Sequence, residues 1–161
     1  MSAVTREQVL DCLSRVPDPE IPILTITDLG IVRDVEIDDE VVVQLSPTYS
    51  GCPATEVIEQ SVIDALHRAG VDRVRIRRTL SPPWTTDWLS DAGRRKLRDY
   101  GIAPPVRAAG KRALLSAGHD IACPRCSSTR TTRVSEFGST PCKAAYRCSD
   151  CLEPFEYFKC I

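Results

Sequence analysis

The chain has 161 residues, enough for one domain of about 100 residues and a small additional module. No apolar run is long enough to cross a membrane, and residues 1–20 lack a basic segment followed by an apolar one, so we expect a cytoplasmic protein. The net charge of −1 hides an asymmetry, because residues 1–60 hold 3 basic and 12 acidic side chains whereas residues 94–133 hold 10 basic and 2 acidic. The basic stretch could bind nucleic acid, an acidic protein or the chain's own acidic half.

The chain begins with a predicted helix and a proline-rich loop. Thr5-Arg-Glu-Gln8 has the form of a capping box, and the apolar spacing that follows predicts a helix over residues 6–16 that ends at Pro17. The next stretch, Asp-Pro-Glu-Ile-Pro, cannot be helical, because its two prolines enforce extended or turned backbone. We expect this loop to expose the carboxylates of Asp18 and Glu20.

The segments from residue 31 to residue 79 predict a small mixed sheet. Residues 31–37 and 41–45 are β-branched runs joined by a short polar turn, which indicates an antiparallel hairpin. A helix capped by Gly70 follows, and residues 71–79 alternate apolar and arginine side chains as a half-buried strand does. The order α-β-β-α-β, with a right-handed parallel crossover, predicts an α+β domain with both helices on one face of the sheet.

Cys52 precedes the second helix and is a candidate reactive thiol. Pro53 suits the first helical position, which would place Cys52 at the N-cap, where backbone N–H groups and the helix dipole favour a thiolate. Cys12, beside the apolar stripe of the first helix, is expected to be a small core residue.

The middle of the chain predicts a short third helix and a linker. Residues 91–100 have a helical pattern that ends at Gly101, and Trp84 and Trp88 are expected to anchor the core. We therefore divide the chain into a domain over residues 1–105, a linker over 106–119 and a module over 120–161.

The last module contains two pairs of cysteines with metal-ligand spacing. Cys123-Pro-Arg-Cys126 and Cys148-Ser-Asp-Cys151 are separated by 21 residues, and short predicted strands lie between and after them. Each C-x-x-C turn aims two sulfurs at one point, so a hairpin between the pairs would build the tetrahedral shell that zinc accepts. The spacing predicts a zinc ribbon whose folding depends on the metal.

Other interpretations of these cysteines remain open. Disulfides do not persist in the cytosol and a redox C-x-x-C normally occurs singly, but a four-cysteine iron site has the same spacing as a zinc site. Cys142 and Cys160 could each replace one of the four predicted ligands.

Several motifs resemble known families. Asp18-Pro-Glu-Ile-Pro, Asp28-Leu-Gly-Ile-Val32, the Thr48–Pro53 loop and Ser81-Pro-Pro-Trp84 resemble the small α/β domain of SufT-like iron–sulfur assembly factors over about residues 5–105. The stretches at 135–143 and 153–160 resemble the PaaD family, whose members belong to phenylacetyl-CoA epoxidase systems.

The resemblance implies an accessory, non-catalytic role in phenylacetate degradation, through maturation of the iron–sulfur centre of the epoxidase system. It carries Asp18, Glu20 and Cys52 over as metal- or cluster-handling residues that could hold iron or a cluster transiently. It also implies partners among the other epoxidase subunits, above all the iron–sulfur reductase, with a second copy of the chain as a further candidate and no membrane. The sequence agrees, because it contains no dinucleotide fingerprint and no Glu-x-x-His pair.

Three alternatives compete with this interpretation. Asp18 and Glu20 could be purely structural turn residues, with Cys52 buried beside them. The four-cysteine site could be a rubredoxin-like iron centre, which would make the chain an electron-transfer or structural subunit of the same complex. A nucleic-acid module beside the basic stretch ranks last, since no basic strand with interleaved aromatics accompanies it.

If the ribbon is a docking surface, some of the aromatics Phe155, Tyr157 and Phe158 should face a partner.

Overall fold

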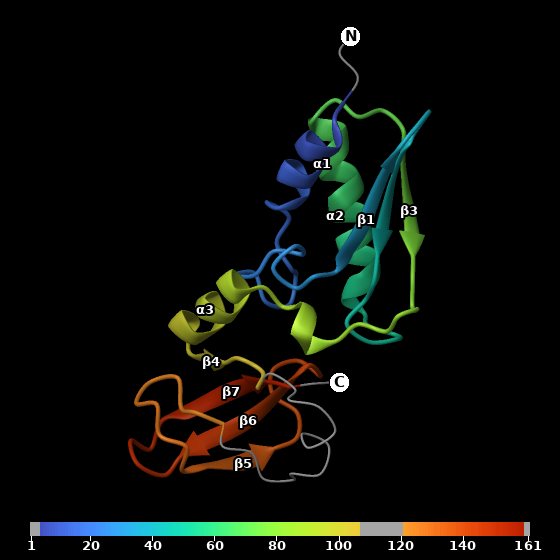
Figure 1. Cartoon of the computed structure of the whole chain (residues 1–161). Helices are drawn as coiled ribbons and strands as arrows, with labels where there is room; N and C mark the ends of the chain where they lie inside the picture. Colours follow the sequence, from blue (N-terminus) through green and yellow to red (C-terminus); the bar gives the residue numbers. More distant parts are fainter. Residues whose placement is uncertain (1–3, 107–120, 160–161) are drawn as a thin grey trace. The chain divides into compact units, whose positions relative to one another are not determined.

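The computed structural model describes residues 4–106 and 121–159, which fall into two compact units (Figure 1). The first unit comprises residues 1–93 and the second residues 94–161. The predicted linker at 106–119 lies almost wholly outside the described residues, and Cys160 lies outside them as well. No helix within the described ranges is long and apolar enough to span a membrane.

The first unit begins with helix α1, Arg6–Leu13. The predicted capping box is present, because Gln8 N donates to Thr5 Oγ1 at 3.2 Å and Thr5 N donates to Gln8 Oε1 at 2.9 Å. The helix ends three residues earlier than predicted. Pro17 disfavours helical backbone at the residue before it, so the chain leaves the helix at Ser14 and continues in tight turns.

Three strands form the sheet of this unit in the order β1-β2-β3. Strands β1, Val32–Ile37, and β2, Val41–Leu45, make the predicted antiparallel hairpin, and β3, Val74–Arg78, runs parallel to β2. The crossover from β2 to β3 is helix α2, Ala54–Arg68. Figure 1 shows α1 and α2 on the same side of this sheet, so the predicted fold class is confirmed.

The core of the first unit lies between these helices and the sheet. Its fully buried members are apolar and come from both helices, from β2 and from the loop before β1: Val9, Leu13, Leu24, Ile26, Leu29, Val43, Val62 and Leu66. Trp84 closes the core as predicted, since the residue is 5% exposed and its Nε1 donates to the Leu29 carbonyl at 2.7 Å. Trp88 is half-buried, with the Arg33 guanidinium 3.4 Å from its ring centre.

Two further helices follow the first sheet. They are the short η1, Thr86–Trp88, and α3, Asp91–Tyr100, which matches the predicted third helix and is followed by Gly101 at a φ of +92°.

The second unit contains a four-stranded sheet in the order β4-β7-β6-β5. Strands β5, Thr131–Ser135, β6, Lys143–Cys148, and β7, Pro154–Phe158, form the antiparallel meander that the ribbon prediction required. Strand β4, Ile102–Ala103, pairs in parallel with β7.

The aromatic residues of β7 belong to the interior of this second unit. Phe155, Tyr157 and Phe158 are 7%, 9% and 2% exposed, so the expectation that some of them face a partner is wrong. The physical reason is the size of the unit: a sheet of short strands has few apolar side chains, and Phe155 and Tyr157 pack in one buried cluster with Cys123 and Cys148.

Candidate functional site

The four ribbon cysteines of the second unit lie together. Their sulfur atoms all lie within 4.8 Å of one another, with 3.7 Å between the sulfurs of Cys123 and Cys151 and 3.6 Å between those of Cys126 and Cys148. A metal–sulfur distance of about 2.3 Å places the corners of a regular tetrahedron about 3.8 Å apart. The residues present therefore fit a tetrahedral thiolate-bound metal ion.

The two C-x-x-C turns have the same backbone geometry. The residue after each pair, Ser127 and Leu152, has a φ of +62°, and the first cysteine of each pair donates its N–H to the carbonyl five residues on at 2.9 Å. A left-handed conformation costs a residue with a side chain about 1–2 kcal/mol, so two such turns would not arise without a compensating interaction. Binding of one metal ion by all four sulfurs would supply that compensation.

The protonation of these thiols is unequal. A backbone hydrogen bond from Cys151, together with hydrogen bonds from the neighbouring thiols, lowers the pKa of Cys148 below its usual value. The Ser128 amide lowers the pKa of Cys126, but desolvation and its thiol neighbours outweigh that effect and raise it. Binding of a divalent cation by the four sulfurs would displace the thiol protons.

The four cysteines of the cluster differ in their exposure to solvent. Cys123 and Cys148 are 1% and 0% exposed, Cys151 is half-buried and Cys126 is exposed. An apolar cluster that includes Ile121, Phe155 and Tyr157 packs around the buried pair. Cys142 lies outside the four-sulfur group, and its sulfur lies 3.0 Å from Thr140 Oγ1.

The structure changes the interpretation of Asp18. We expected an exposed carboxylate, but Asp18 is only 7% exposed, and its Oδ1 accepts hydrogen bonds from Glu20 N at 2.9 Å and Ile21 N at 2.7 Å. The expected exposure is wrong because the turned backbone directs two amides inward, and a carboxylate beside them is the nearest acceptor. Glu20 is half-buried.

Cys52 lies one residue before the position predicted for it. Pro53 is the N-cap of α2 and makes no side-chain capping bond, so the prediction of Cys52 as N-cap is wrong by one residue. Pro53 has a φ of −65° but has no N–H to donate, and the helix proper begins at Ala54. Cys52 is half-buried, and its carbonyl accepts from Thr55 N at 3.1 Å, so it remains in the first turn of the helix.

Asp18, Glu20 and Cys52 do not form a preassembled ligand set. In the part of the chain that the structure describes, the ribbon cysteines are the one group of three or more potential metal ligands whose ligand atoms lie close together. The Oδ1 of Asp18 is engaged by the backbone of its own loop.

Ser46 is a buried polar residue that the sequence did not single out. It follows β2 directly, is 0% exposed, and its Oγ makes no hydrogen bond within the described residues. In the sequence this serine stands between a predicted strand and a proline, and that position could have indicated its burial.

Comparison with known proteins finds two family models on the chain. Residues 6–76 match a model described as an iron–sulfur cluster assembly protein, and residues 107–159 match one described as the PaaD zinc beta ribbon domain.

A curated relative from Escherichia coli, named as a putative subunit of 1,2-phenylacetyl-CoA epoxidase, is 51% identical over 150 residues, covering 92% of this chain and 89% of the relative. A relative from Porphyromonas gingivalis, named "Fe-S protein maturation auxiliary factor", is 34% identical, covering 54% of this chain and 85% of the relative. The crystal structure of a domain of unknown function from Bacillus anthracis matches 56% of this chain and 89% of that one, at 27% identity and a TM-score of 0.53. The resemblances to an assembly-factor domain and to a ribbon-bearing epoxidase subunit are confirmed.

Proposed function

The chain belongs to the PaaD family, a family of subunits of phenylacetyl-CoA epoxidase systems, and from that membership we propose that it matures the iron–sulfur centre of the complex and takes no part in its catalysis. The observation that carries the proposal is the presence of an assembly-factor domain and an epoxidase-subunit ribbon on one polypeptide. The relative named as a maturation auxiliary factor supports it, because 54% of this chain aligns with 85% of that protein. The iron–sulfur reductase of the system, in the cytoplasm, is the proposed client.

The ribbon has a structural role in this proposal. Cys123, Cys126, Cys148 and Cys151 would hold one zinc ion, which has no redox chemistry and fixes the two turns of the second unit. Sulfur separations of 3.6 and 3.7 Å support a tetrahedral ion. Metal analysis of the purified chain tests the assignment: a Cys148→Ser, Cys151→Ser double variant should lose the zinc, and full occupancy in that variant would overturn the ligand set.

Cys52 is the proposed contact for the transferred iron or cluster. Cys52 is half-buried just before α2, where the first N–H groups of the helix favour an anionic ligand such as a cluster. We assign Asp18 a positioning role, since it fixes the backbone of its loop, and Glu20 is the second candidate contact, made on transfer.

The decisive experiment measures iron and acid-labile sulfide in the reductase purified from four strains. These are the parent, a deletion of this chain, Cys52→Ala and the matched control Cys12→Ala, another half-buried cysteine of the same unit. We expect depleted reductase in the deletion and Cys52→Ala strains and full loading in the other two. A fully loaded reductase in every strain, with epoxidation still lost, would refute maturation.

Two variants separate the role of Asp18 from that of a ligand. Asp18→Asn retains an oxygen acceptor for the amides of Glu20 and Ile21 but removes the charge, whereas Asp18→Ala removes both. If Asp18 only positions the loop, the Asn variant should load the reductase normally and the Ala variant should not. Equal failure of both variants at unchanged stability would make the charge itself the required feature.

An iron-binding protein, acting in electron transfer or as a structural component of the same complex, is the second candidate function. The observation in its favour is that four sulfurs at tetrahedral separation can hold iron in the same geometry as zinc. Iron bound by four thiolates would colour the purified protein red and would undergo reversible reduction, whereas zinc would do neither.

A further inference from the structure

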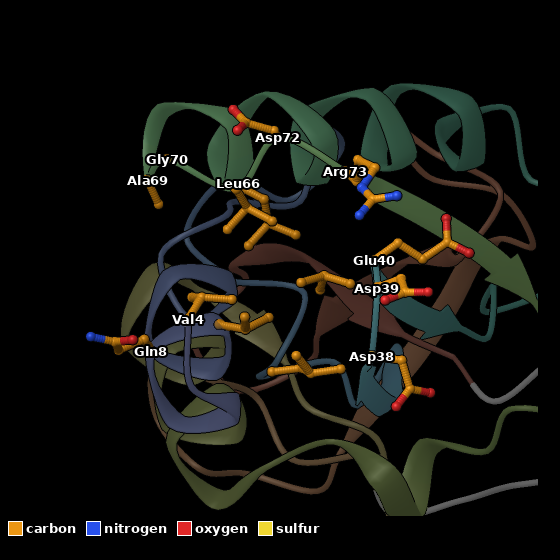
Figure 2. A pocket seen from close by; sticks show the side chains of 14 residues that line it. Val4, Gln8, Asp38, Asp39, Glu40, Leu66, Ala69, Gly70, Asp72 and Arg73 are labelled. Atoms are coloured by element: carbon orange, nitrogen blue, oxygen red, sulfur yellow. The ribbon is translucent and has the colours of Figure 1, made fainter. Parts of the chain in front are cut away.

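A hollow of about 580 Å³ opens at one end of the first unit (Figure 2). It lies where the start of α1, the end of α2 and the turn from β1 to β2 approach one another. Figure 2 shows Leu66 near the centre of the hollow, Asp38, Asp39 and Glu40 along one side, and Val4, Gln8 and Ala69 along the other. All these residues come from the first unit.

The floor of the hollow is apolar. Val9, Leu66 and Val71 reach it from the core, where they are 1%, 0% and 6% exposed. Val4 and Ile37 stand in its walls and are only half-buried, so each keeps apolar surface that a ligand could cover. Burying such surface is favourable by about 25 cal/mol per Å². The hollow can therefore hold an apolar side chain.

The rim carries a concentration of negative charge. Asp38, Asp39 and Asp72 are exposed, and none of them forms an ion pair with any residue that the structure describes. Glu40 adds a fourth carboxylate, which pairs with Arg75, and Arg73 is the cation that lines the hollow. Unpaired carboxylates around an apolar floor attract a cationic ligand and orient it.

The hollow continues into a second one of about 560 Å³. The two share Gln8 and Ala69, and the second follows the seam between α1 and α2 past Cys12 to Pro17. Its ionic side chains are balanced in number, since it is lined by two carboxylates, Asp11 and Asp64, and two guanidinium groups, Arg15 and Arg68, and Asp11 pairs with Arg15. An elongated groove of this kind, with one acidic end, suits an extended or helical stretch of polypeptide better than a compact small molecule.

We propose that this α1–α2 groove, formed by the two hollows, binds a basic peptide segment of a partner protein. One or two apolar side chains of the segment would fill the hollow above Leu66, and its lysines or arginines would lie against Asp38, Asp39 and Asp72. The inference goes beyond the proposed function, and it uses neither Cys52 nor the ribbon, so the reductase-loading experiment and the binding experiment can fail separately.

The test is a titration of the full ¹⁵N-labelled chain, followed by NMR. The probe is a short synthetic peptide that alternates leucine with lysine and arginine, and the comparison ligands are the same peptide with glutamate at every basic position and the polyamine spermine. We expect the basic peptide to shift the amides of residues 38–41 and 69–73 and of Gln8. The acidic peptide should leave them unchanged, and spermine, which lacks an apolar anchor, should bind at least tenfold more weakly.

Matched variants identify the contact. Ala69→Tyr places a ring where the two hollows meet and should weaken peptide binding at least tenfold, whereas Val57→Tyr, at an exposed position of the same helix outside both hollows, should leave it unchanged. Replacing Asp38, Asp39 and Asp72 together by asparagine should weaken binding at low salt about fivefold or more and reduce its dependence on salt. Retained native amide shifts would show that each variant is folded.

Three results would overturn the proposal. They are shifts that map to the open face of the sheet, equal binding by the Ala69→Tyr and Val57→Tyr variants, and equal affinity for spermine and the peptide. Shifts of the same groove amides that depend on protein concentration, with no peptide present, would make a second copy of the chain the occupant instead.

Discussion

Gly30 makes a close contact that tests the packing of the first unit. Its φ is +68°, and a Cβ added to it would lie 2.5 Å from the carbonyl oxygen of Trp88 and 2.7 Å from the Trp88 Cβ. Gly30→Ala must therefore hold an alanine in the left-handed region, at about 1–2 kcal/mol, and also displace backbone, at about 1–3 kcal/mol. The alanine also reduces the conformational entropy of the unfolded chain, which stabilises the folded state by about 0.4–1 kcal/mol. We expect the free energy of unfolding to fall by about 2–4 kcal/mol.

Gly70→Ala is the matched control for this contact. Gly70 also has a positive φ, of +86°, but no atom would lie within 4 Å of its added Cβ, so only the backbone cost of about 1 kcal/mol applies. The difference between the two variants isolates the contact with Trp88.

Urea unfolding followed by tryptophan fluorescence measures both variants. The chain has two tryptophans, Trp84 and Trp88, and both lie in the first unit, so the signal reports that unit selectively. If Gly30→Ala and Gly70→Ala lost the same stability, the close approach of Gly30 to Trp88 would be refuted, because backbone conformation alone would account for both.

Three further predictions concern the ribbon and the reactive thiol. Chelation of the metal should abolish hydrogen-exchange protection in residues 121–159 while tryptophan fluorescence stays native, and protection that survives chelation would contradict metal-dependent folding. Glu156→Gln should lower the stability of the second unit by about 2–3 kcal/mol, because it leaves Lys143, whose side chain is 6% exposed, without its partner at 3.0 Å. Burial alone would raise the pKa of Glu156, but hydrogen bonds from Ser139 and Lys143 hold that pKa below its usual 4.5. The stability that this carboxylate contributes is therefore present above about pH 4.5 and is lost as the pH falls through the lower pKa of the folded state. Hydrogen exchange measured against pH should show this loss in the parent protein and not in the Gln variant. Cys52 should alkylate faster than Cys12, whose thiol donates to the Ala65 carbonyl at 3.4 Å, and equal rates by mass spectrometry would count against a reactive Cys52.

Periodicity and spacing were sufficient to predict most of the architecture. The hairpin of β1 and β2, the parallel crossover to β3 and the three main ribbon strands follow from local patterns, because turn signals bound each of these short runs. Strand β4 has no such pattern. Two residues next to prolines become a strand only because β7, more than fifty residues later in the chain, offers them its free edge.

Side-chain exposure was harder to predict than secondary structure. The Asp-Pro-Glu-Ile-Pro motif correctly excludes a helix, but its composition alone does not decide whether the carboxylate of Asp18 faces water or the loop's own amides. The tail aromatics presented the same difficulty, since their burial depends on how few other apolar residues the second unit has. Cys52 lies one residue further from α2 than predicted, a difference within the usual uncertainty of helix ends.

The two candidate metal-binding regions differ in how much of the site exists before the metal binds. In the ribbon, two matching turns bring four sulfurs to tetrahedral separation, so binding requires little rearrangement and suits an ion that stays. Around Cys52 the other predicted ligands are not assembled, and Asp18 is engaged by its own loop. Under the proposed function, Cys52 would hold a metal weakly until a second protein supplied further ligands. A carrier that completed the coordination shell alone would retain its cargo.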